Sequence, residues 1–176
     1  MKKVKLYIAM SLNGKIAAAD GGVDWLEAIP NPDDSDYGYS NFYDSIDTTV
    51  QGHATYKEIL SWDIEFPYLS KRNYVFTRDE TKRDDRNAMF VSKNPVDFMR
   101  DLKLKDGKDI WLIGGGQINT LLLNAGLIDE IQVYVMPIIL TEGINLFEAL
   151  PNETGLHLES SKTYASGAVE MLYTIK

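Results

Sequence analysis

The fold is decided by the stretch Asp109-Ile110-Trp111-Leu112-Ile113-Gly114-Gly115-Gly116-Gln117-Ile118-Asn119. Its first half is an apolar run typical of a buried strand, and its last residues begin a helix-like segment. The glycines between them leave backbone N–H groups accessible beside the positive end of a helix, which favours a bound phosphate group. Glycine also serves in tight turns that bind nothing. This stretch alone therefore leaves both interpretations open.

The same glycines match only part of the dinucleotide-binding fingerprint Gly-x-Gly-x-x-Gly. Gly114 and Gly116 fit its first two glycine positions, but Asn119 stands where the third glycine is required. The motif therefore does not predict an ordinary Rossmann site. A nucleotide-binding function needs support from other parts of the chain.

Length and composition predict one globular domain, residues 1–176. The chain has 44% hydrophobic and 25% charged residues, which is typical of a soluble globular protein. No segment approaches the roughly 18 consecutive apolar residues of a membrane span, and the first residues run into a strand pattern without a signal-peptide core. We therefore expect a cytoplasmic protein that does not act at a membrane.

The residue types also limit the chemistry. There is no cysteine, and the two histidines, His53 and His157, are far apart in the sequence, so a metal held by the protein is not expected. The net charge of −8 argues against nucleic acid as a partner. Residues 16–56 contain eight acidic residues and no lysine or arginine. One wall of the protein is therefore predicted to be acidic.

Apolar periodicity predicts strands that alternate with helices. The predicted strands are residues 4–10, 48–51, 74–77, 89–92, 110–113, 131–140, 156–163 and 169–175. The predicted helices are residues 34–45, residues 55–60, a helix that Asn94 caps and Pro95 begins, and residues 117–125, which Gly126 closes. This order predicts an α/β fold with a mainly parallel central sheet, helices on both faces, and an antiparallel C-terminal hairpin.

Ligands of such sheets bind outside the carboxyl ends of the strands. Small or phosphate-binding residues follow four of the predicted strands, at 11–17, 52–56, 76–78 and 114–116. We therefore expect these four segments to surround one ligand.

In the order and spacing of its motifs, the chain resembles the dihydrofolate reductase superfamily. It is more closely similar to the C-terminal reductase domain of the bifunctional riboflavin-biosynthesis deaminase-reductase, including the stand-alone proteins of that kind. The motifs are Met-Ser-Leu-Asn-Gly-Lys-Ile-Ala at 10–17, Val-Asp-Trp-Leu at 23–26, and Met-Pro-Ile-Ile-Leu-Thr-Glu-Gly at 136–143. The resemblance covers nearly the whole chain and implies a dihydrofolate reductase-like three-layer sandwich.

The resemblance implies that NADPH is the cofactor. Thr77 and Arg78 match the position that holds the 2′-phosphate in this superfamily, and a hydroxyl with a guanidinium suits a dianion. Gly52 and Thr55 match a segment that contacts the pyrophosphate in this superfamily. His53 replaces the arginine of the family pattern, which predicts weaker or pH-sensitive binding of the cofactor phosphates. A surface histidine with no ligand is the alternative. The remaining cofactor residues that the resemblance implies are Ala9, Ile16, Gly114, Gly115, Gly116, Gln117 and Ile118.

The implied reaction is hydride transfer to a C=N or C=O group, with a proton delivered to the heteroatom. A carboxylate can serve as the general acid at neutral pH only if its pKa is raised or if it relays a proton through water. Asp36 is our choice, because it lies sixteen residues before Gly52 with tyrosines beside it, and Asp24 is the runner-up. A helix cap or a solvated loop acid is the alternative for both. Asn13, Lys15 and Trp25 are the candidates for substrate contacts.

The substrate is less well defined by these patterns. The resemblance implies a small heterocycle, as in 5-amino-6-(5-phosphoribosylamino)uracil reductase, but the predicted acidic wall opposes a phosphate group and favours a dihydrofolate or dihydropterin. A non-catalytic NADPH sensor or interaction module is the hypothesis from another class. The apolar run 131–140 and relatives of the riboflavin branch suggest a homodimer.

Overall fold

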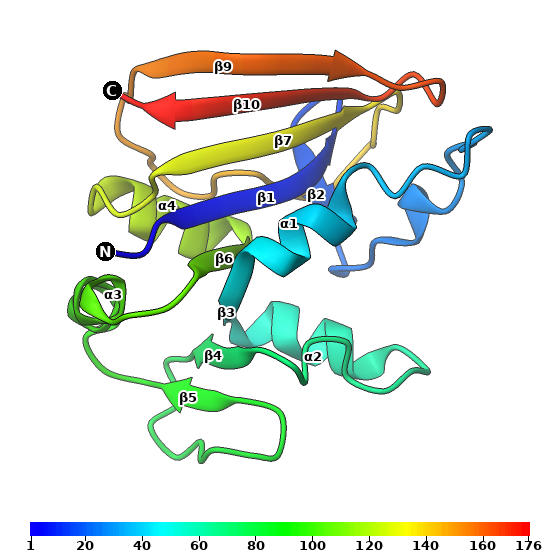
Figure 1. The fold of residues 1–176 in the computed structure, drawn as a ribbon. Helices are drawn as coiled ribbons and strands as arrows, with labels where there is room; N and C mark the ends of the chain where they lie inside the picture. The colour runs from blue at the N-terminus through cyan, green and yellow to red at the C-terminus, as the bar shows by residue number, and fades with distance from the viewer.

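The centre of the structure, a computed structural model that describes residues 1–176, is an eight-stranded sheet. Its strand order is β5-β4-β3-β6-β1-β7-β10-β9 (Figure 1). The strands are β1 (Val4–Ser11), β3 (Ile46–Gly52), β4 (Arg72–Phe76), β5 (Met89–Val91), β6 (Asp109–Gly114), β7 (Glu130–Met136), β9 (Leu156–Thr163) and β10 (Val169–Ile175). β2 (Lys15–Ala17) and β8 (Ile144–Asn145) form a separate small pair.

The strands from β5 to β7 are parallel to their neighbours, and β10 pairs antiparallel with both β7 and β9. The helices are α1 (Tyr39–Ser45), α2 (His53–Ser61), α3 (Pro95–Leu104) and α4 (Gly116–Asn124), with a short 3₁₀ helix at Asp24–Leu26. None of these helices is both long and apolar enough to span a bilayer.

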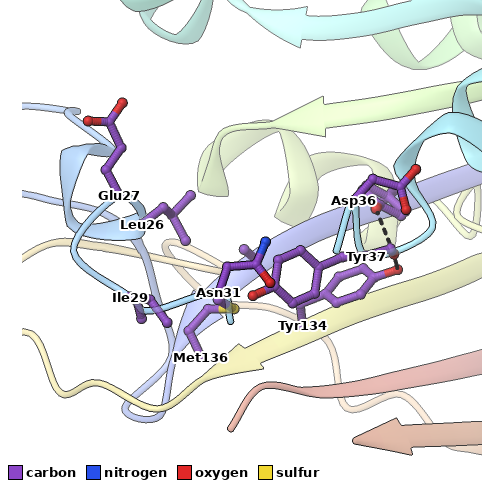
Figure 2. A pocket seen from close by; sticks show the side chains of 10 residues that line it. Leu26, Glu27, Ile29, Asn31, Asp36, Tyr37, Tyr134 and Met136 are labelled. Carbon is purple, nitrogen blue, oxygen red and sulfur yellow. Dashed lines mark hydrogen bonds between the residues drawn. The ribbon is translucent and has the colours of Figure 1, made fainter. Parts of the chain in front are cut away.

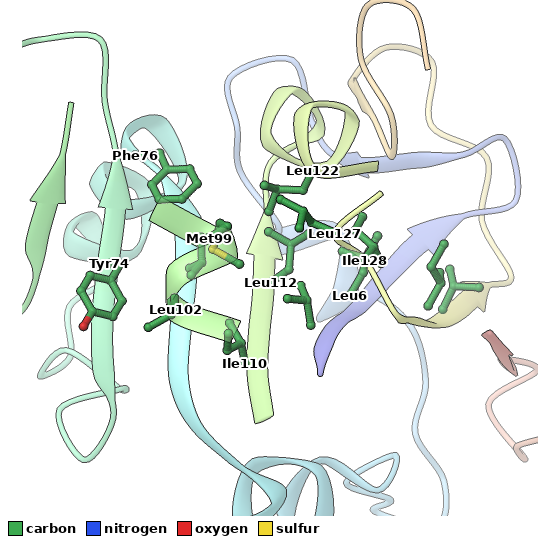
Figure 3. Packing of buried hydrophobic residues seen from close by; sticks show 14 residues of the cluster. Leu6, Tyr74, Phe76, Met99, Leu102, Ile110, Leu112, Leu122, Leu127 and Ile128 are labelled. Carbon is green, nitrogen blue, oxygen red and sulfur yellow. The ribbon is translucent and has the colours of Figure 1, made fainter. Parts of the chain in front are cut away.

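Two apolar cores cover the two faces of the sheet. Leu6 lies opposite Leu112 of β6 and Ile131 of β7 in the strand register, and these side chains share the first core with α3 and α4 (Figure 3). The second core contains Trp111, whose side chain alternates with that of Leu112, and it packs against α1 and α2. Helices therefore lie on both faces, and the predicted three-layer α/β fold with its C-terminal hairpin is confirmed.

Some predicted boundaries differ from the structure. The helix expected at 34–45 begins only at Tyr39, because Asp34, Tyr37 and Gly38 have positive φ angles that interrupt a right-handed helix. The strand expected at 131–140 ends at Met136, directly before Pro137, which has no N–H to continue the ladder.

The ends of α3 and α4 show what local sequence can and cannot predict. Asn94 stands at the N-cap of α3 as predicted, but its φ is 47° and its side chain makes no capping hydrogen bond. Gly126 follows α4 with a φ of 65°, and its N–H bonds the carbonyl of Leu123 while the N–H of Leu127 bonds that of Leu122. This is the Schellman pattern that the position of Gly126 predicts.

Candidate functional site

A cleft of about 1920 Å³ lies over the carboxyl ends of the central parallel strands. The four segments that the sequence places after strands all contribute to its wall, through Ile16, Gly52, Thr77 and Gly115. The β2–β8 pair closes one side, with Ala17 and Ile144 among the lining residues. The structure therefore brings together segments that are far apart in the sequence.

Two helices of nine residues begin at this cleft. α2 has Gly52 at its N-cap and α4 has Gly115, and neither N-cap residue has a side chain that bonds the first turn. The two turns are close neighbours, since a Cβ on Gly52 would stand 3.1 Å from Cγ1 of Ile118 and a Cβ on Gly115 would stand 3.4 Å from Oγ1 of Thr55. Both helices thus direct the positive ends of their dipoles into one place, which suits an anion such as a pyrophosphate.

Arg78 joins the loop after β4 to the start of α4. Its Nη2 donates a hydrogen bond to Oε1 of Gln117 at 3.1 Å, and it is the only lysine or arginine that lines the cleft. Thr77 lies beside it, with an Oγ1 that accepts the N–H of Asp79. The Thr-Arg pair and the triple-glycine turn therefore lie in the same wall of the cleft, as the predicted nucleotide site requires.

His53 is the first residue of α2 and also lines the cleft. Partial burial, followed by the charges of Lys82 and Lys57, lowers the pKa of its imidazole below the usual 6.5. The neutral form of His53 therefore predominates at pH 7. In this form it supplies no full charge to an anion at the start of α2.

A second cavity of about 420 Å³ adjoins the cleft and shares Tyr7, Ala9 and Leu26 with it. Figure 2 shows the side chains that line this cavity. Its size is in the range of small-molecule sites. The other lining residues are Glu27, Ile29, Asn31, Asp36, Tyr37, Tyr134 and Met136. The cavity is thus mainly apolar and aromatic, and it lies beside the cleft.

The tyrosines of this cavity differ in how firmly their hydroxyls are held. Tyr134 donates a 2.6 Å hydrogen bond to the carbonyl of Tyr37, whereas Tyr7 approaches the same carbonyl at 3.4 Å, which is long for such a bond. Burial raises the pKa of Tyr7 to about 12, so its hydroxyl stays protonated at neutral pH. Tyr7 is therefore a protonated donor whose hydrogen bond is only loosely engaged.

Asp36 lines the smaller cavity but has the environment of a helix cap. Its exposed carboxylate accepts the backbone N–H groups of Ser40 at 3.1 Å and Gly38 at 2.8 Å, and these bonds lower its pKa. A general acid at neutral pH needs a raised pKa. The geometry therefore favours the capping alternative over the predicted acid. Asp24 is exposed in the 3₁₀ helix and lines neither cavity.

The three predicted substrate contacts lie outside both cavities. Oδ1 of Asn13 accepts the N–H of Leu140, and its Nδ2 donates to the Leu140 carbonyl, so Asn13 fixes a turn. Lys15 donates to Oδ1 of Asn145, and Trp25 packs among the residues around Tyr134. Asn13 and Lys15 therefore have hydrogen-bond partners within the protein, whereas Nε1 of Trp25 is buried without one.

The predicted cofactor residues are placed more favourably. Those that line the cleft are Ala9, Ile16, Gly52, His53, Thr55, Thr77, Arg78, Gly115, Gly116, Gln117 and Ile118. Gly114 precedes them at the end of β6 and forms a cis peptide bond with Gly115.

Sequence reasoning missed the aromatic cavity. Tyr7 and Ala9 alternate on β1, Tyr134 and Met136 alternate on β7, and the register sets Ala9 opposite Tyr134. Period-two alternation on two strands was the available signal. It could not be used because the sequence does not show that β1 and β7 are neighbours.

Comparison with known proteins finds one family model and two similar proteins of Bacillus subtilis. The model of the RibD C-terminal domain matches residues 69–169. The uncharacterized protein YwjB of Bacillus subtilis is 37% identical to this chain over 172 residues. The uncharacterized protein YyaP of the same organism is 31% identical to it over 189 residues. Each match covers 98% of this chain, and the matches cover 97% of the length of YwjB and 94% of the length of YyaP.

Solved structures agree with these relatives. A protein of Shewanella sp. PV-4 named for riboflavin biosynthesis has a TM-score of 0.87 at 31% identity, over 100% of this chain and 99% of its own. The deaminase/5-amino-6-(5-phosphoribosylamino)uracil reductase of Thermotoga maritima has a TM-score of 0.69 at 16% identity, over 99% of this chain and 57% of its own. The latter similarity shows the shared fold.

Proposed function

The chain belongs to the family of RibD C-terminal domains, and on this premise we propose that it is an NADPH-dependent reductase of a small heterocyclic substrate. One observation carries the proposal: Arg78 and the uncapped starts of α2 and α4 line a single cleft. When bound, NADPH supplies a hydride for a C=N or C=O group. The family supports a reductase of the riboflavin-pathway type.

The donors in the cleft fit the charged parts of this cofactor. Arg78 and the hydroxyl of Thr77 would hold the 2′-phosphate, and the first turns of α2 and α4 would hold the pyrophosphate. Ala9 and Ile16 would line the path toward the smaller cavity. Because a charge-assisted hydrogen bond contributes about 1.5–3 kcal/mol, Arg78 would select NADPH over NADH.

The smaller cavity would hold the substrate beside the cleft. Leu26, Ile29 and Met136 would give the substrate apolar contacts there. Tyr7 lines both cavities, and its hydroxyl would donate a hydrogen bond to the heteroatom that is being reduced. Its raised pKa keeps the hydroxyl protonated, and the proton of the product would come from water.

Two measurements test this proposal. Fluorescence titration with NADPH and with NADH should show tighter binding of NADPH. Steady-state oxidation of NADPH should then be followed with dihydrofolate, dihydrobiopterin and the ribosylamino-pyrimidine of the riboflavin pathway. Turnover of any of them supports an enzyme, binding without any turnover supports the sensor alternative, and absence of NADPH binding overturns both. The homodimer stays a prediction, which analytical ultracentrifugation can test.

A further inference from the structure

The wall of the smaller cavity contains no positive charge. Of its ten lining residues, seven are hydrophobic, and the only ionisable groups besides the tyrosines are the carboxylates of Glu27 and Asp36. Both carboxylates belong to exposed residues. A substrate phosphate in this cavity would find like charges and no cation.

The adjoining cleft does not supply a cation near this cavity either. Its only arginine, Arg78, lies after β4 and is bonded to Gln117 of α4, whereas the small cavity is built on β1 and β7. β3 and β6 separate β4 from β1 in the sheet (Figure 1). The only other basic side chain in the cleft is His53, which belongs to α2 after β3. The single full positive charge in the lining of the cleft is thus separated from the smaller cavity by two strands.

The remaining chemistry of the cavity suits a flat ring. The rings of Tyr7 and Tyr134 lie 5.2 Å apart and those of Tyr37 and Tyr134 lie 6.1 Å apart, so aromatic faces and edges form the wall. Carboxylates accept hydrogen bonds, and those of Glu27 and Asp36 would complement the N–H groups of an amino-substituted ring. The hydroxyl of Tyr7 would complement a ring carbonyl or imine.

We infer that the substrate is a planar, amino-bearing heterocycle without a phosphate group. This inference rests on the proposed function and departs from the substrate in the name of the Thermotoga maritima reductase, which carries a phosphoribosyl group. The chain would therefore act on a compound that has lost its phosphate or has never carried one. A reaction that removes a phosphate, or one that builds a ring without it, must supply this substrate.

Isothermal titration of the protein with two matched compounds tests the inference. The compounds are 5-amino-6-(5-phosphoribosylamino)uracil and the same molecule without its phosphate, and dihydrobiopterin serves as a third, phosphate-free ring. We expect the unphosphorylated pyrimidine to bind about tenfold more tightly than the phosphorylated one, because the phosphate would face two carboxylates and no cation that could pair with it. Equal or tighter binding of the phosphorylated compound overturns the inference.

A charge reversal locates the effect. Glu27→Lys adds a cation to the wall of the cavity. In this variant the unphosphorylated pyrimidine should bind at most about threefold more tightly than the phosphorylated one. Glu65→Lys makes the same change of net charge at an exposed position outside both cavities and should leave the preference unchanged. Equal responses of the two variants would show that the overall charge, and not this cavity, sets the preference.

NADPH titration of the same samples separates this inference from the proposed function. If NADPH binds but none of the three rings does, the substrate inference is wrong and the cofactor site stands. If NADPH does not bind, the proposed function fails whatever the ring compounds do. Both readouts are equilibrium measurements and need no turnover.

Discussion

Nη2 of Arg78 lies 3.1 Å from Oε1 of Gln117, although the two residues are 39 positions apart in the chain. This bond connects the loop after β4 with the first turn of α4, so the guanidinium is held at the start of a helix. A guanidinium and a helix N-terminus both attract anions. Their proximity makes this side of the cleft its most favourable place for a phosphate.

Arg78→Ala should weaken NADPH binding by about tenfold to a hundredfold, since one charge-assisted hydrogen bond contributes roughly 1.5–3 kcal/mol. NADH, which has no 2′-phosphate, should bind almost as it does to the unmodified protein. Arg83→Ala is the matched control, because Arg83 is exposed, bonds only the carbonyls of Glu80 and Lys82, and does not line the cleft. An equal loss of NADPH and NADH affinity in Arg78→Ala would contradict recognition of the 2′-phosphate.

His53 predicts a pH-dependent affinity. The pKa of its imidazole is lowered from the usual 6.5, so protonation of His53 should strengthen binding of NADP⁺ only at acid pH. His53→Arg should increase affinity at pH 7.5 by up to about fivefold, because a partly exposed ion pair contributes up to about 1 kcal/mol. Titrations from pH 5.5 to 8 measure both effects.

His53→Gln is the control for this series, since it keeps a polar side chain and cannot be protonated. The 2′-phosphate also titrates near pH 6, and its contribution is common to all variants. The difference between the unmodified protein and His53→Gln therefore reports His53 alone. Identical pH profiles for the two would rule out contact between the imidazole and the cofactor phosphates.

Tyr7→Phe tests whether the hydrogen bond from the Tyr7 hydroxyl assists the reduction. The variant keeps the ring that stacks on Phe42 at 4.0 Å and removes only the hydroxyl, so stability should change by less than about 1 kcal/mol. We expect kcat to fall by about tenfold to a hundredfold with little change in NADPH affinity. Tyr43→Phe, whose hydroxyl bonds Ser70 outside both cavities, should leave kcat unchanged.

Asp36→Asn should affect stability more than catalysis. Because Asp36 accepts the N–H groups of Ser40 and Gly38, the variant should lose about 0.5–1 kcal/mol of unfolding free energy and retain most of kcat. Chemical denaturation and steady-state kinetics on the same preparation measure both quantities. Loss of turnover at unchanged stability would restore Asp36 as the general acid.

Local patterns predicted the fold well where the signal is carried by neighbouring residues. The passage from β6 through Gly114 to α4 follows from one apolar run and its glycines, and β9 and β10 begin and end where the alternation predicts. The end of α4 before Gly126 was likewise predicted from neighbouring residues. Each of these depends on backbone preferences that act within a few residues.

The candidate site could be predicted only in part. The residues after the strands meet because parallel strands end at the same edge, and this rule needs no knowledge of strand order. The cavity around Tyr7 and Tyr134 needs the pairing of β1 with β7, which the sequence does not show. The spacing of Asp36 suggested an acid, but a capping carboxylate and a catalytic one occupy similar sequence positions. Only the N–H groups of Gly38 and Ser40 distinguish them.

Stability toward acid should depend on the pair that joins the start of β1 to β3. The Lys2 side chain is 1% exposed, and its ammonium group bonds the carboxylate of Asp47. The backbone N–H of Lys108 donates to the same carboxylate. Burial raises the pKa of Asp47, but the bonds from Lys2, Thr48 and Lys108 outweigh it and lower the pKa overall. The stabilisation is therefore complete above the unfolded pKa near 3.9 and is lost as the pH falls through the lower folded value.

Asp47→Asn should reduce the unfolding free energy at pH 7 by about 3 kcal/mol, since it leaves a buried ammonium without its counter-charge. Urea denaturation at pH 7, 4.5 and 3 should show a smaller acid dependence in this variant than in the unmodified protein, because one carboxylate with a lowered pKa is gone. Asp44→Asn is the control, as Asp44 is exposed and its carboxylate has no ion-pair partner. If Asp47→Asn and Asp44→Asn lose stability in parallel between pH 4.5 and 3, the Lys2–Asp47 pair does not control unfolding in acid.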